Sequence, residues 1–410
     1  MYKLFFPLIL ICYCNSGFAE NLKVCESCNY KSPKEAVEKA SPFDTITIEK
    51  GQYECISLVL DKPLTLIGEK GAVLDGKQQG YILIIKSDSV TIDGLTLIGS
   101  GRSYTKDFAA IYVDRSKNFS IKNNIIRDPF FGVLVEKSHH GEIISNEVSG
   151  HSMREDDSGN GIHLWHCSNV LIDNNEVSHL RDGIYFEFVT ESTITNNLSH
   201  NNIRYGLHFM FSNNDDYIGN EFINNGAGVA VMFSKFIVMR ENRFIKNWGT
   251  TSYGLLLKEI YDAEVVDNLF EENTMAIFVE GSTRINYTNN NLHRNGWAVK
   301  ISGGCYTNIF SGNNFVGNAF DVSYNSKLND NKFEGNYWSE YVGYDIDKNG
   351  IGDVPYRPVK LFSYIVNQTP ETIILLRSLF IDILNFSEKV SPVFTPDKLV
   401  DISPNMRMIN

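Results

Sequence analysis

Residues 183 to 206 read GIYFEFVTESTITNNLSHNNIRYG, and the same pattern recurs along much of the chain. A glycine or alanine opens a short apolar run, and an asparagine follows 14 residues later in the first seven repeats. Most steps between the opening residues are 22 or 23 residues long, a period typical of solenoids with one coil per repeat. The opening residues are Gly132, Gly161, Gly183, Gly206, Gly228, Gly254, Ala276 and Ala298.

The apolar run after each opening residue has the alternation of a strand. Places are counted from the opening residue, so that Ile184 and Phe186 are places one and three after Gly183. Places one and three are apolar and are expected to point inward, and places two and four are expected to point outward. Stacked parallel strands of this kind form a parallel β-helix. The sequence therefore predicts an all-β protein, a right-handed parallel β-helix of the pectin-lyase type, with an N-terminal helical cap and a short C-terminal helical tail.

The repeated asparagines are expected to be structural. At a corner of each coil an asparagine tolerates turn geometry and can hydrogen-bond the amide of the next coil. Their positions are Asn146, Asn175, Asn197, Asn220, Asn242, Asn268 and Asn290.

Five segments are predicted along the chain. Lys3, an apolar run and a small-residue cleavage site mark residues 1–19 as a signal peptide, which predicts export to the periplasm. Residues 20–87 hold the cap, beginning at Ser32-Pro33-Lys34-Glu35, a capping box, and the first irregular coils. Regular coils follow over 88–342, a turn rich in Asp, Asn and Gly over 343–360 closes the solenoid, and 361–410 form a tail that caps the last coil or docks on a partner.

The charge and hydropathy of the chain exclude some partners. A net charge of −12 argues against nucleic acid. The apolar segment at 372–384 contains Arg377 and Asp382 and is too short to span a membrane, so no transmembrane span is expected in the mature chain.

Five cysteines lie outside the signal peptide. Cys25 and Cys28 are separated by two residues, which in an oxidising compartment favours a local disulfide, with a metal or redox site as the alternative. Cys55, Cys167 and Cys305 complete an odd number, so at least one thiol is free or intermolecular.

The outward places gather a candidate copper site. His208 and Met210 occupy places two and four of one coil, Met232 is place four of the next, and Glu187 and His163 lie one and two coils before. Thioether and imidazole are ligands that soft Cu(I) accepts, so a transient Cu(I) site is predicted at His163, Glu187, His208, Met210 and Met232. The alternative is packing beneath the loops of two overlong coils, around 150–159 and 248–253, or a protein interface.

A second constellation resembles half of a calcium loop. Asp345, Asp347, Asn349, the backbone of Ile351 and Asp353 have suitable spacing, but Tyr356 stands where the bidentate glutamate belongs. Either calcium binds with another carboxylate, or this is a hydrogen-bonded turn. Both roles are structural.

An exported β-helix could also act on polysaccharides. Such enzymes need paired acids, and Arg154, Asp156, Asp157, Glu187 and Lys258 could be assigned such roles. No tight acid–acid motif recurs, however, so an enzyme is not expected.

Several segments resemble the NosD family. They are 161–166, 181–189, 204–211, 226–232, 252–259, 335–338 and 350–358, and the likeness covers nearly the whole mature chain. The resemblance implies a non-enzymatic periplasmic maturation factor of nitrous oxide reductase. Such a factor is bound to a membrane ABC transporter, accepts Cu(I) from a lipoprotein copper chaperone and delivers it to the apo-reductase. The alternatives are a scaffold without copper contact and a secreted polysaccharide lyase or hydrolase. The family's copper ligands are not carried over, and the Cys25–Cys28 pair is not attributed to it.

Overall fold

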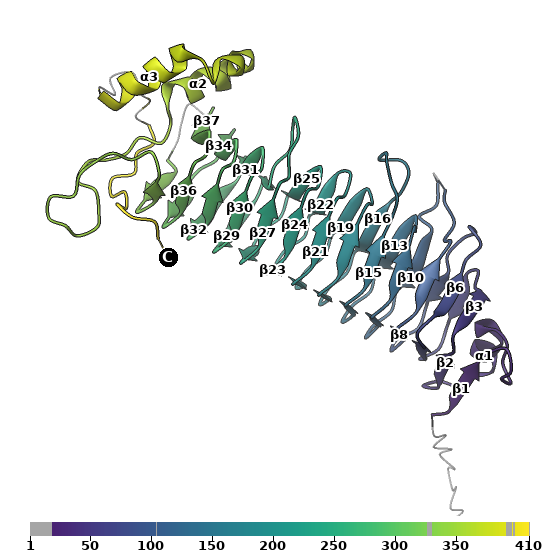
Figure 1. Cartoon of the computed structure of the whole chain (residues 1–410). Coiled ribbons are helices and arrows are strands. Elements are labelled where there is room, and N and C mark those ends of the chain that lie inside the picture. The colour runs from purple at the N-terminus through teal and green to yellow at the C-terminus, as the bar shows by residue number, and fades with distance from the viewer. Residues whose placement is uncertain (1–18, 104, 326–329, 391–395, 397, 410) are drawn as a thin grey trace, which may run out of the picture.

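A computed structural model describes residues 19–103, 105–325, 330–390, 396 and 398–409. The chain forms an elongated solenoid, with helices at both ends (Figure 1). The predicted signal peptide lies outside the described residues, apart from Ala19.

Three parallel sheets form the walls of the solenoid, which confirms the predicted parallel β-helix. Within the described residues they contain 14, 13 and 12 strands. The first comprises β1 (Asn21–Val24), β2 (Thr45–Ile48), β5 (Thr65–Gly68), β8 (Thr91–Asp93), β11 (Ser120–Lys122), β14 (Glu142–Ile144), β17 (Leu171–Asp173), β20 (Thr193–Thr195), β23 (Asp216–Ile218), β26 (Val238–Arg240), β29 (Tyr261–Val266), β32 (Thr283–Thr288), β35 (Ile309–Ser311) and β38 (Lys332–Glu334).

The second sheet comprises β3 (Gly51–Glu54), β6 (Ala72–Asp75), β9 (Thr96–Ile98), β12 (Ile125–Arg127), β15 (Glu147–Ser149), β18 (Glu176–Ser178), β21 (Leu198–His200), β24 (Glu221–Ile223), β27 (Arg243–Ile245), β30 (Leu269–Glu271), β33 (Asn291–His293), β36 (Asn314–Val316) and β39 (Tyr337–Trp338).

The third sheet, called the site sheet below, holds the strand after each opening residue. It comprises β4 (Leu58–Leu60), β7 (Leu83–Ile85), β10 (Ala109–Asp114), β13 (Phe131–Glu136), β16 (Asn160–Trp165), β19 (Asp182–Glu187), β22 (Tyr205–Met210), β25 (Ala227–Met232), β28 (Leu255–Lys258), β31 (Met275–Glu280), β34 (Trp297–Ser302) and β37 (Phe320–Tyr324).

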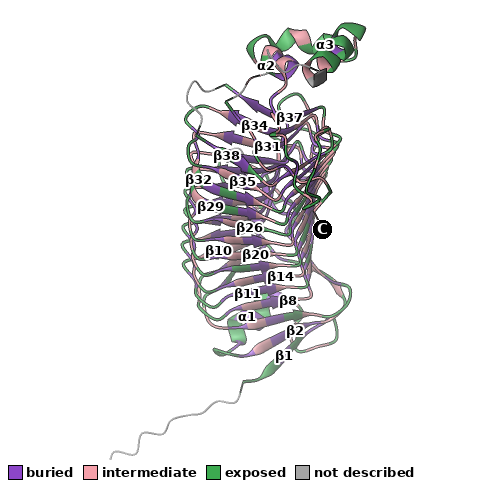
Figure 2. Cartoon of the chain, turned by 90° about the vertical axis from the view of Figure 1, so that its left-hand side faces the viewer, coloured by how far each residue is buried: buried purple, intermediate pink, exposed green. Residues whose placement is uncertain are grey.

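The register follows the repeat. Ile162, Ile184, Leu207 and Val229 pair in sequence across β16, β19, β22 and β25, and all four are fully buried. Buried and partly exposed residues alternate along the strands (Figure 2). The alternation predicted from the sequence therefore sets which side chains form the core.

The asparagines form a buried ladder, as expected. The Asn197 side chain donates to Asn220 Oδ1 at 2.9 Å and to the Ile172 carbonyl at 2.9 Å, and its backbone N–H donates to the same Asn220 oxygen at 3.0 Å. The ladder is longer than the sequence repeat indicated and runs through Asn124, Asn146, Asn175, Asn197, Asn220, Asn242, Asn268, Asn290, Asn313 and Asn336.

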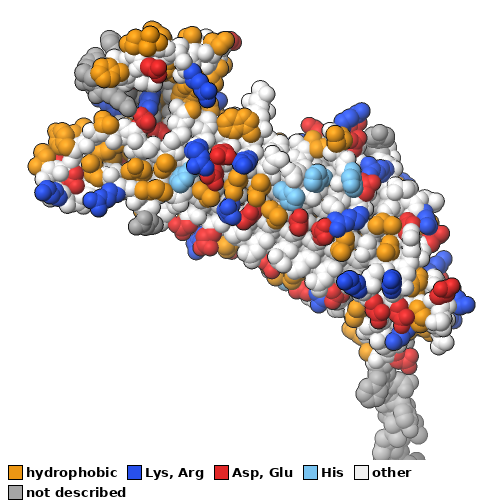
Figure 3. All heavy atoms as spheres, viewed as in Figure 1, with side chains coloured by type: hydrophobic (Ala, Val, Ile, Leu, Met, Phe, Trp, Pro, Cys, Tyr) orange, Lys and Arg blue, Asp and Glu red, His pale blue; other side chains and the backbone are white. Residues whose placement is uncertain are grey.

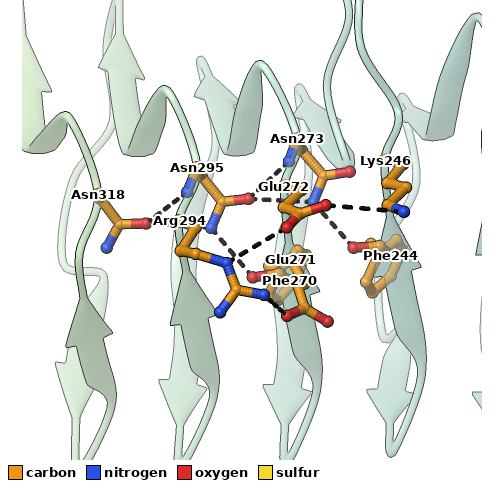
Figure 4. A network of polar contacts seen from close by, with 9 residues as sticks. All are labelled: Phe244, Lys246, Phe270, Glu271, Glu272, Asn273, Arg294, Asn295 and Asn318. Atoms are coloured by element: carbon orange, nitrogen blue, oxygen red, sulfur yellow. Dashed lines mark hydrogen bonds and ion pairs between the residues drawn. The ribbon is translucent and has the colours of Figure 1, made fainter.

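A second ladder lies five residues further along each coil and was missed in the sequence. Asn295 donates to Asn318 Oδ1 at 3.1 Å and to the Phe270 carbonyl at 3.0 Å (Figure 4). On the surface beside it, Arg294 bridges Glu271 and Glu272 (Figure 4). The members are Asn202, Asn225, Asn247, Asn273, Asn295 and Asn318.

The N-terminal end is covered by α1 (Pro33–Lys39). Ser32 caps this helix by accepting from the Glu35 N–H at 3.3 Å, and Ala36 and Val37 are buried. Glu35 accepts from Lys31 N–H at 3.0 Å, one residue before the partner that a capping box requires. The predicted cap is present, with this difference in its hydrogen bonds.

The C-terminal tail contains two different structures. Three helices, α2 (Leu361–Gln368), η1 (Pro370–Leu375) and α3 (Leu379–Val390), form an arm in which Phe362, Val366 and Ile381 pack against Phe320 of β37. Residues 399–409 then return to the last coil (Figure 1). There Asp401 accepts from Asn336 and from Trp338 Nε1, in the place of the next ladder asparagine.

Candidate metal-binding site

The strand register aligns the outward positions of the site sheet from one coil to the next. Tyr185 pairs with His208 across β19 and β22, Glu187 pairs with Met210, and Met210 pairs with Met232 of β25. Glu187 and both methionine side chains are half-buried. The two thioethers therefore lie on adjacent coils, and His208 is two residues before Met210 on the same strand.

His208 differs from the expectation in one respect. It occupies an outward place, yet it is only 7% exposed, because aromatic side chains cover it. Its ring lies 5.1 Å from Tyr185 and 4.7 Å from Tyr205, measured between ring centroids. Among the described residues neither ring nitrogen has a hydrogen-bond partner, and burial lowers the pKa of His208 to about 4. At neutral pH this is an uncharged imidazole with a free lone pair.

His163 lies on the other side of Tyr185. Its ring centroid is 4.6 Å from that of Tyr185, and its Nδ1 contacts Asn160 Nδ2 at 3.2 Å. Burial and the nearby Arg181 charge lower the pKa of His163 to about 3. Since Tyr185 separates the two histidines, His163 is not an immediate neighbour of His208.

The five predicted ligands thus do not form one closed set. Within the described part of the chain, the three potential ligand atoms of His163, Glu187 and His208 do not all lie within 4.8 Å of one another. On the site sheet, Met210 pairs with Glu187 on one side and with Met232 on the other, whereas His163 lies two strands from His208.

A hollow of about 660 Å³ opens over this face. His163, Tyr185, Glu187, His208 and Met210 contribute to its lining. The overlong coil adds another part of the lining through Glu155, Asp156 and Ser158. Thus the insertion at 150–159 does border the candidate site.

Met232 lies outside that hollow, in an adjoining apolar cluster. It packs with Ala230, Tyr253 and Leu256, and Tyr253 ends the second insertion, at 248–253. Both overlong coils therefore contribute to the surroundings of the methionines.

An ion pair beside the hollow was missed in the sequence. Asp182 is fully buried and accepts two hydrogen bonds from Arg204, at 2.9 and 2.7 Å. Arg181 donates to Asn160 at 3.0 Å. The sequence does carry a signal for this ion pair, because Arg181, Asp182 and Arg204 each lie one or two residues before an opening glycine and so fall at matching positions of adjacent coils.

The calcium-like segment forms a turn held by its own carboxylates. Asp345 accepts from the N–H groups of Asn349 and Gly350, at 3.1 and 2.9 Å. Asp353 accepts from Ile346 N–H at 2.7 Å, and Asp347 accepts from the Asn349 side chain at 2.9 Å. These are the bonds expected of the turn interpretation, and calcium binding stays a prediction.

The cysteines occupy two kinds of place. Cys25 and Cys28 form a disulfide, and the carboxylate of Glu49 lies within 4.8 Å of both sulfurs. Cys55, Cys167 and Cys305 are free and buried, and burial raises the pKa of Cys55 to about 12 and of Cys167 to about 11. These three neutral thiols belong to the core and lie outside the candidate metal site.

Comparison with known proteins gives relatives over nearly the whole chain. Residues 144–343 match the family described as periplasmic copper-binding protein (NosD). A protein of Pseudomonas aeruginosa named "Probable ABC transporter binding protein NosD" is 32% identical over 402 residues, covering 91% of this chain and 93% of the relative. A protein of the same name from Stutzerimonas stutzeri is 29% identical, with 87% and 86% covered.

Solved structures share the fold at low identity. The periplasmic alginate epimerase AlgG has a TM-score of 0.54 at 13% identity, covering 76% of this chain and 82% of that one. A family 28 exopolygalacturonase of Yersinia enterocolitica has a TM-score of 0.55 at 12% identity, covering 77% and 78%. At such identity the likeness extends to the β-helix alone.

Proposed function

The chain belongs to the NosD family of periplasmic copper-binding proteins, and from this premise we propose that it carries Cu(I) at His208, Met210 and Met232. It accepts the ion from a lipoprotein copper chaperone and delivers it to apo nitrous oxide reductase while bound to an ABC transporter. It acts as a carrier and not as an enzyme.

The observation that carries this proposal is the state of His208. A buried polar group without a hydrogen bond costs roughly 1–3 kcal/mol, so buried imidazoles are normally paired. His208 is buried and unpaired within the described structure, and it borders an open hollow. Its lone pair would be used by a metal ion.

The neighbouring donors indicate which metal. Two thioethers on adjacent coils add soft ligands to one neutral imidazole, and soft ligands of this kind select Cu(I) over magnesium or calcium. None of the three donors needs to lose a proton at neutral pH. Such a site can take up and release the ion without a large change in charge, as a transient carrier requires.

The C-terminal arm supports attachment to a transporter. Leu379, Phe380, Ile383 and Phe386 of α3 are 59–74% exposed, whereas Ile381 faces inward onto Phe320. Apolar side chains cover much of the arm (Figure 3). An exposed apolar face of this size is typical of a protein contact surface. The relatives are named as ABC transporter binding proteins, so we propose that the arm is the docking element.

Copper binding can be measured directly. In an anaerobic titration of Cu(I) against a chromogenic competitor, we expect His208→Ala and the pair Met210→Ala, Met232→Ala each to weaken binding by roughly tenfold or more. Met153→Ala is the matched control, because this methionine is 87% exposed on the 150–159 loop. Unchanged affinity in the double methionine variant would refute the ligand assignment.

The copper titration and an assay on polysaccharides separate the two alternative functions. A wild-type protein that binds the transporter but no Cu(I) would be a scaffold. Cleavage of uronate polymers by the purified protein would instead establish a polysaccharide-acting enzyme.

Docking is tested with the arm. Phe380→Ser with Phe386→Ser should abolish capture by the transporter in detergent, while Cu(I) affinity stays unchanged. Phe43→Ser, at a residue 66% exposed near the other end of the solenoid, should leave capture intact. Full capture by the α3 variant would exclude the arm as the docking element.

A further inference from the structure

A second group of potential metal ligands lies at the N-terminal end of the solenoid, remote from the C-terminal arm (Figure 1). It consists of Cys25, Cys28 and Glu49. In the described part of the chain, this is the one set of three His, Cys, Asp or Glu side chains whose ligand atoms all lie within 4.8 Å of one another. Nothing in the proposed copper transfer uses it.

The disulfide contributes little to holding this region together. It joins residues only three apart in sequence, and closing so short a loop restricts the unfolded chain less than closing a long loop would. Fold stability alone is therefore a weak reason for a disulfide here.

The turn that carries the two cysteines has other supports. Cys25 N–H donates to the Tyr30 carbonyl at 3.1 Å, and Cys28 N–H donates to the Cys25 carbonyl at 3.2 Å. The Tyr53 hydroxyl contacts the carbonyls of Val24 and Glu49, at 3.3 and 3.1 Å. These bonds tie the turn to the strand end that carries Glu49. The backbone of the turn should therefore stay in place when the disulfide is reduced, and rotation of the two cysteine side chains separates the sulfurs.

The group is also accessible. Cys25 is 8% exposed, whereas Cys28 and Glu49 are half-buried, so a reductant and a metal ion can approach from the Cys28 side. Glu49 is held only loosely by Lys23, at 3.9 Å, and both side chains of that pair are partly exposed. The carboxylate is free to turn toward an ion at little cost.

We propose that reduction of the Cys25–Cys28 disulfide creates a zinc site. A dithiol gives two electrons and two protons to the S–S bond; the protein gains two thiols and the dithiol becomes a disulfide. Zn²⁺ then displaces both thiol protons and binds the two thiolates and the Glu49 carboxylate, with water as fourth ligand. Two sulfurs and one carboxylate oxygen are ligands that tetrahedral Zn²⁺ accepts.

The test compares oxidised and reduced full-length protein. After treatment with dithiothreitol and its anaerobic removal, Zn²⁺ is titrated against a chromogenic chelator. We expect one equivalent to bind to the reduced protein, with release of two protons, and none to the oxidised protein. Equal binding by both forms, or no binding by either, would overturn the proposal.

Variants locate the ion. Cys25→Ser and, separately, Cys28→Ser should abolish Zn²⁺ binding, and Glu49→Gln should weaken it by roughly tenfold. Glu69→Gln, a nearby acid outside the group, and His208→Ala, at the copper site, should bind as the wild type does. Two cysteine variants that both bind Zn²⁺ normally would refute the assignment. An unchanged circular dichroism spectrum after reduction verifies that the solenoid remains folded.

Discussion

At the scale of the residue, burial shifts the pKa values of two titratable groups, His208 and Asp215. His208 is uncharged because aromatic rings shield it from water, and among the described residues its two buried ring nitrogens have no hydrogen-bond partner. Asp215 is a buried acid with one oxygen lacking a partner within the described structure. Each gives a pH dependence of its own.

Copper affinity should be nearly independent of pH over the neutral and mildly acidic range. The pKa of His208 is lowered to about 4, so protons compete with Cu(I) only near and below that pH. A site whose histidine had the ordinary pKa of about 6.5 would lose roughly tenfold in Cu(I) affinity by about pH 5.5. Competition titrations at pH 8, 7, 6 and 5 check this. A tenfold loss between pH 7 and 5.5 would contradict it.

Replacing Asp215 by asparagine should stabilise the protein, increasingly so at higher pH. Burial raises the pKa of Asp215 to about 8, from 3.8 in the unfolded chain. Between these values the unfolded state releases the proton and the folded state keeps it, so stability falls as pH rises.

The Asp215→Asn substitution removes this loss of stability at high pH and supplies an amide that can donate a hydrogen bond. Asn308, four coils on, shows the bond it can make, because its side chain donates to the Ser282 carbonyl at 3.0 Å. At pH 8 we expect a gain of roughly a few kcal/mol, and less at pH 5. Urea unfolding at both pH values measures it, with Asp216→Asn as control. An equal effect of the Asp215 substitution at both pH values would contradict the account.

At the scale of the element, the asparagine ladders link each coil to the next. Their amides satisfy backbone groups at corners that are sealed from water, which strand pairing cannot reach. Asn220 accepts two hydrogen bonds from Asn197 and donates to Asn242 and to the Ile194 carbonyl. The repeated residue is therefore part of the scaffold.

Breaking one rung should be costly. Asn220→Ala leaves several buried polar groups without partners, and we expect the free energy of unfolding to fall by roughly 2–4 kcal/mol. Asn286→Ala is the control, because Asn286 is exposed on β32, and it should change stability by less than about 0.5 kcal/mol. Equal midpoints of urea unfolding for the two variants would show that the ladder is not stabilising.

At the scale of the whole molecule, the solenoid must close its last coil. Asp401 does so by accepting from the backbone N–H groups of Gly335 and Asn336 and from the indole of Trp338. An uncovered coil would present unpaired backbone groups, which favour end-to-end association. The segment after the arm is thus a cap, and α2 of the arm also covers the last coil, because Ser363 and Asn367 donate to carbonyls of β37.

Asp401→Ala should lower the unfolding temperature and promote oligomers. The buried donors of Asn336 and Trp338 lose a charged acceptor, which costs on the order of 3 kcal/mol. Asp382→Ala, an exposed acid on α3, should have no effect on either property. Thermal unfolding and light scattering measure both. A monomeric Asp401→Ala variant of wild-type stability would exclude the capping role.

Much of the fold, and part of the candidate site, could be predicted from the sequence because the fold is periodic. A constant step and a period-two alternation determine the core positions, the stacking of the first asparagines and the alignment of Met210 with Met232. Local pairing repeats in every coil, so these features depend on residues close in sequence or one period apart.

Other features were decided only by tertiary packing. Tyr185 separates His163 from His208, His208 has no hydrogen-bond partner among the described residues, and Asp401 accepts from Asn336, 65 residues before it. Each depends on the shape of side chains or on a chain reversal that has no period. The repeat therefore predicted which positions adjoin, and the packing determined which of the side chains there are covered by aromatic rings.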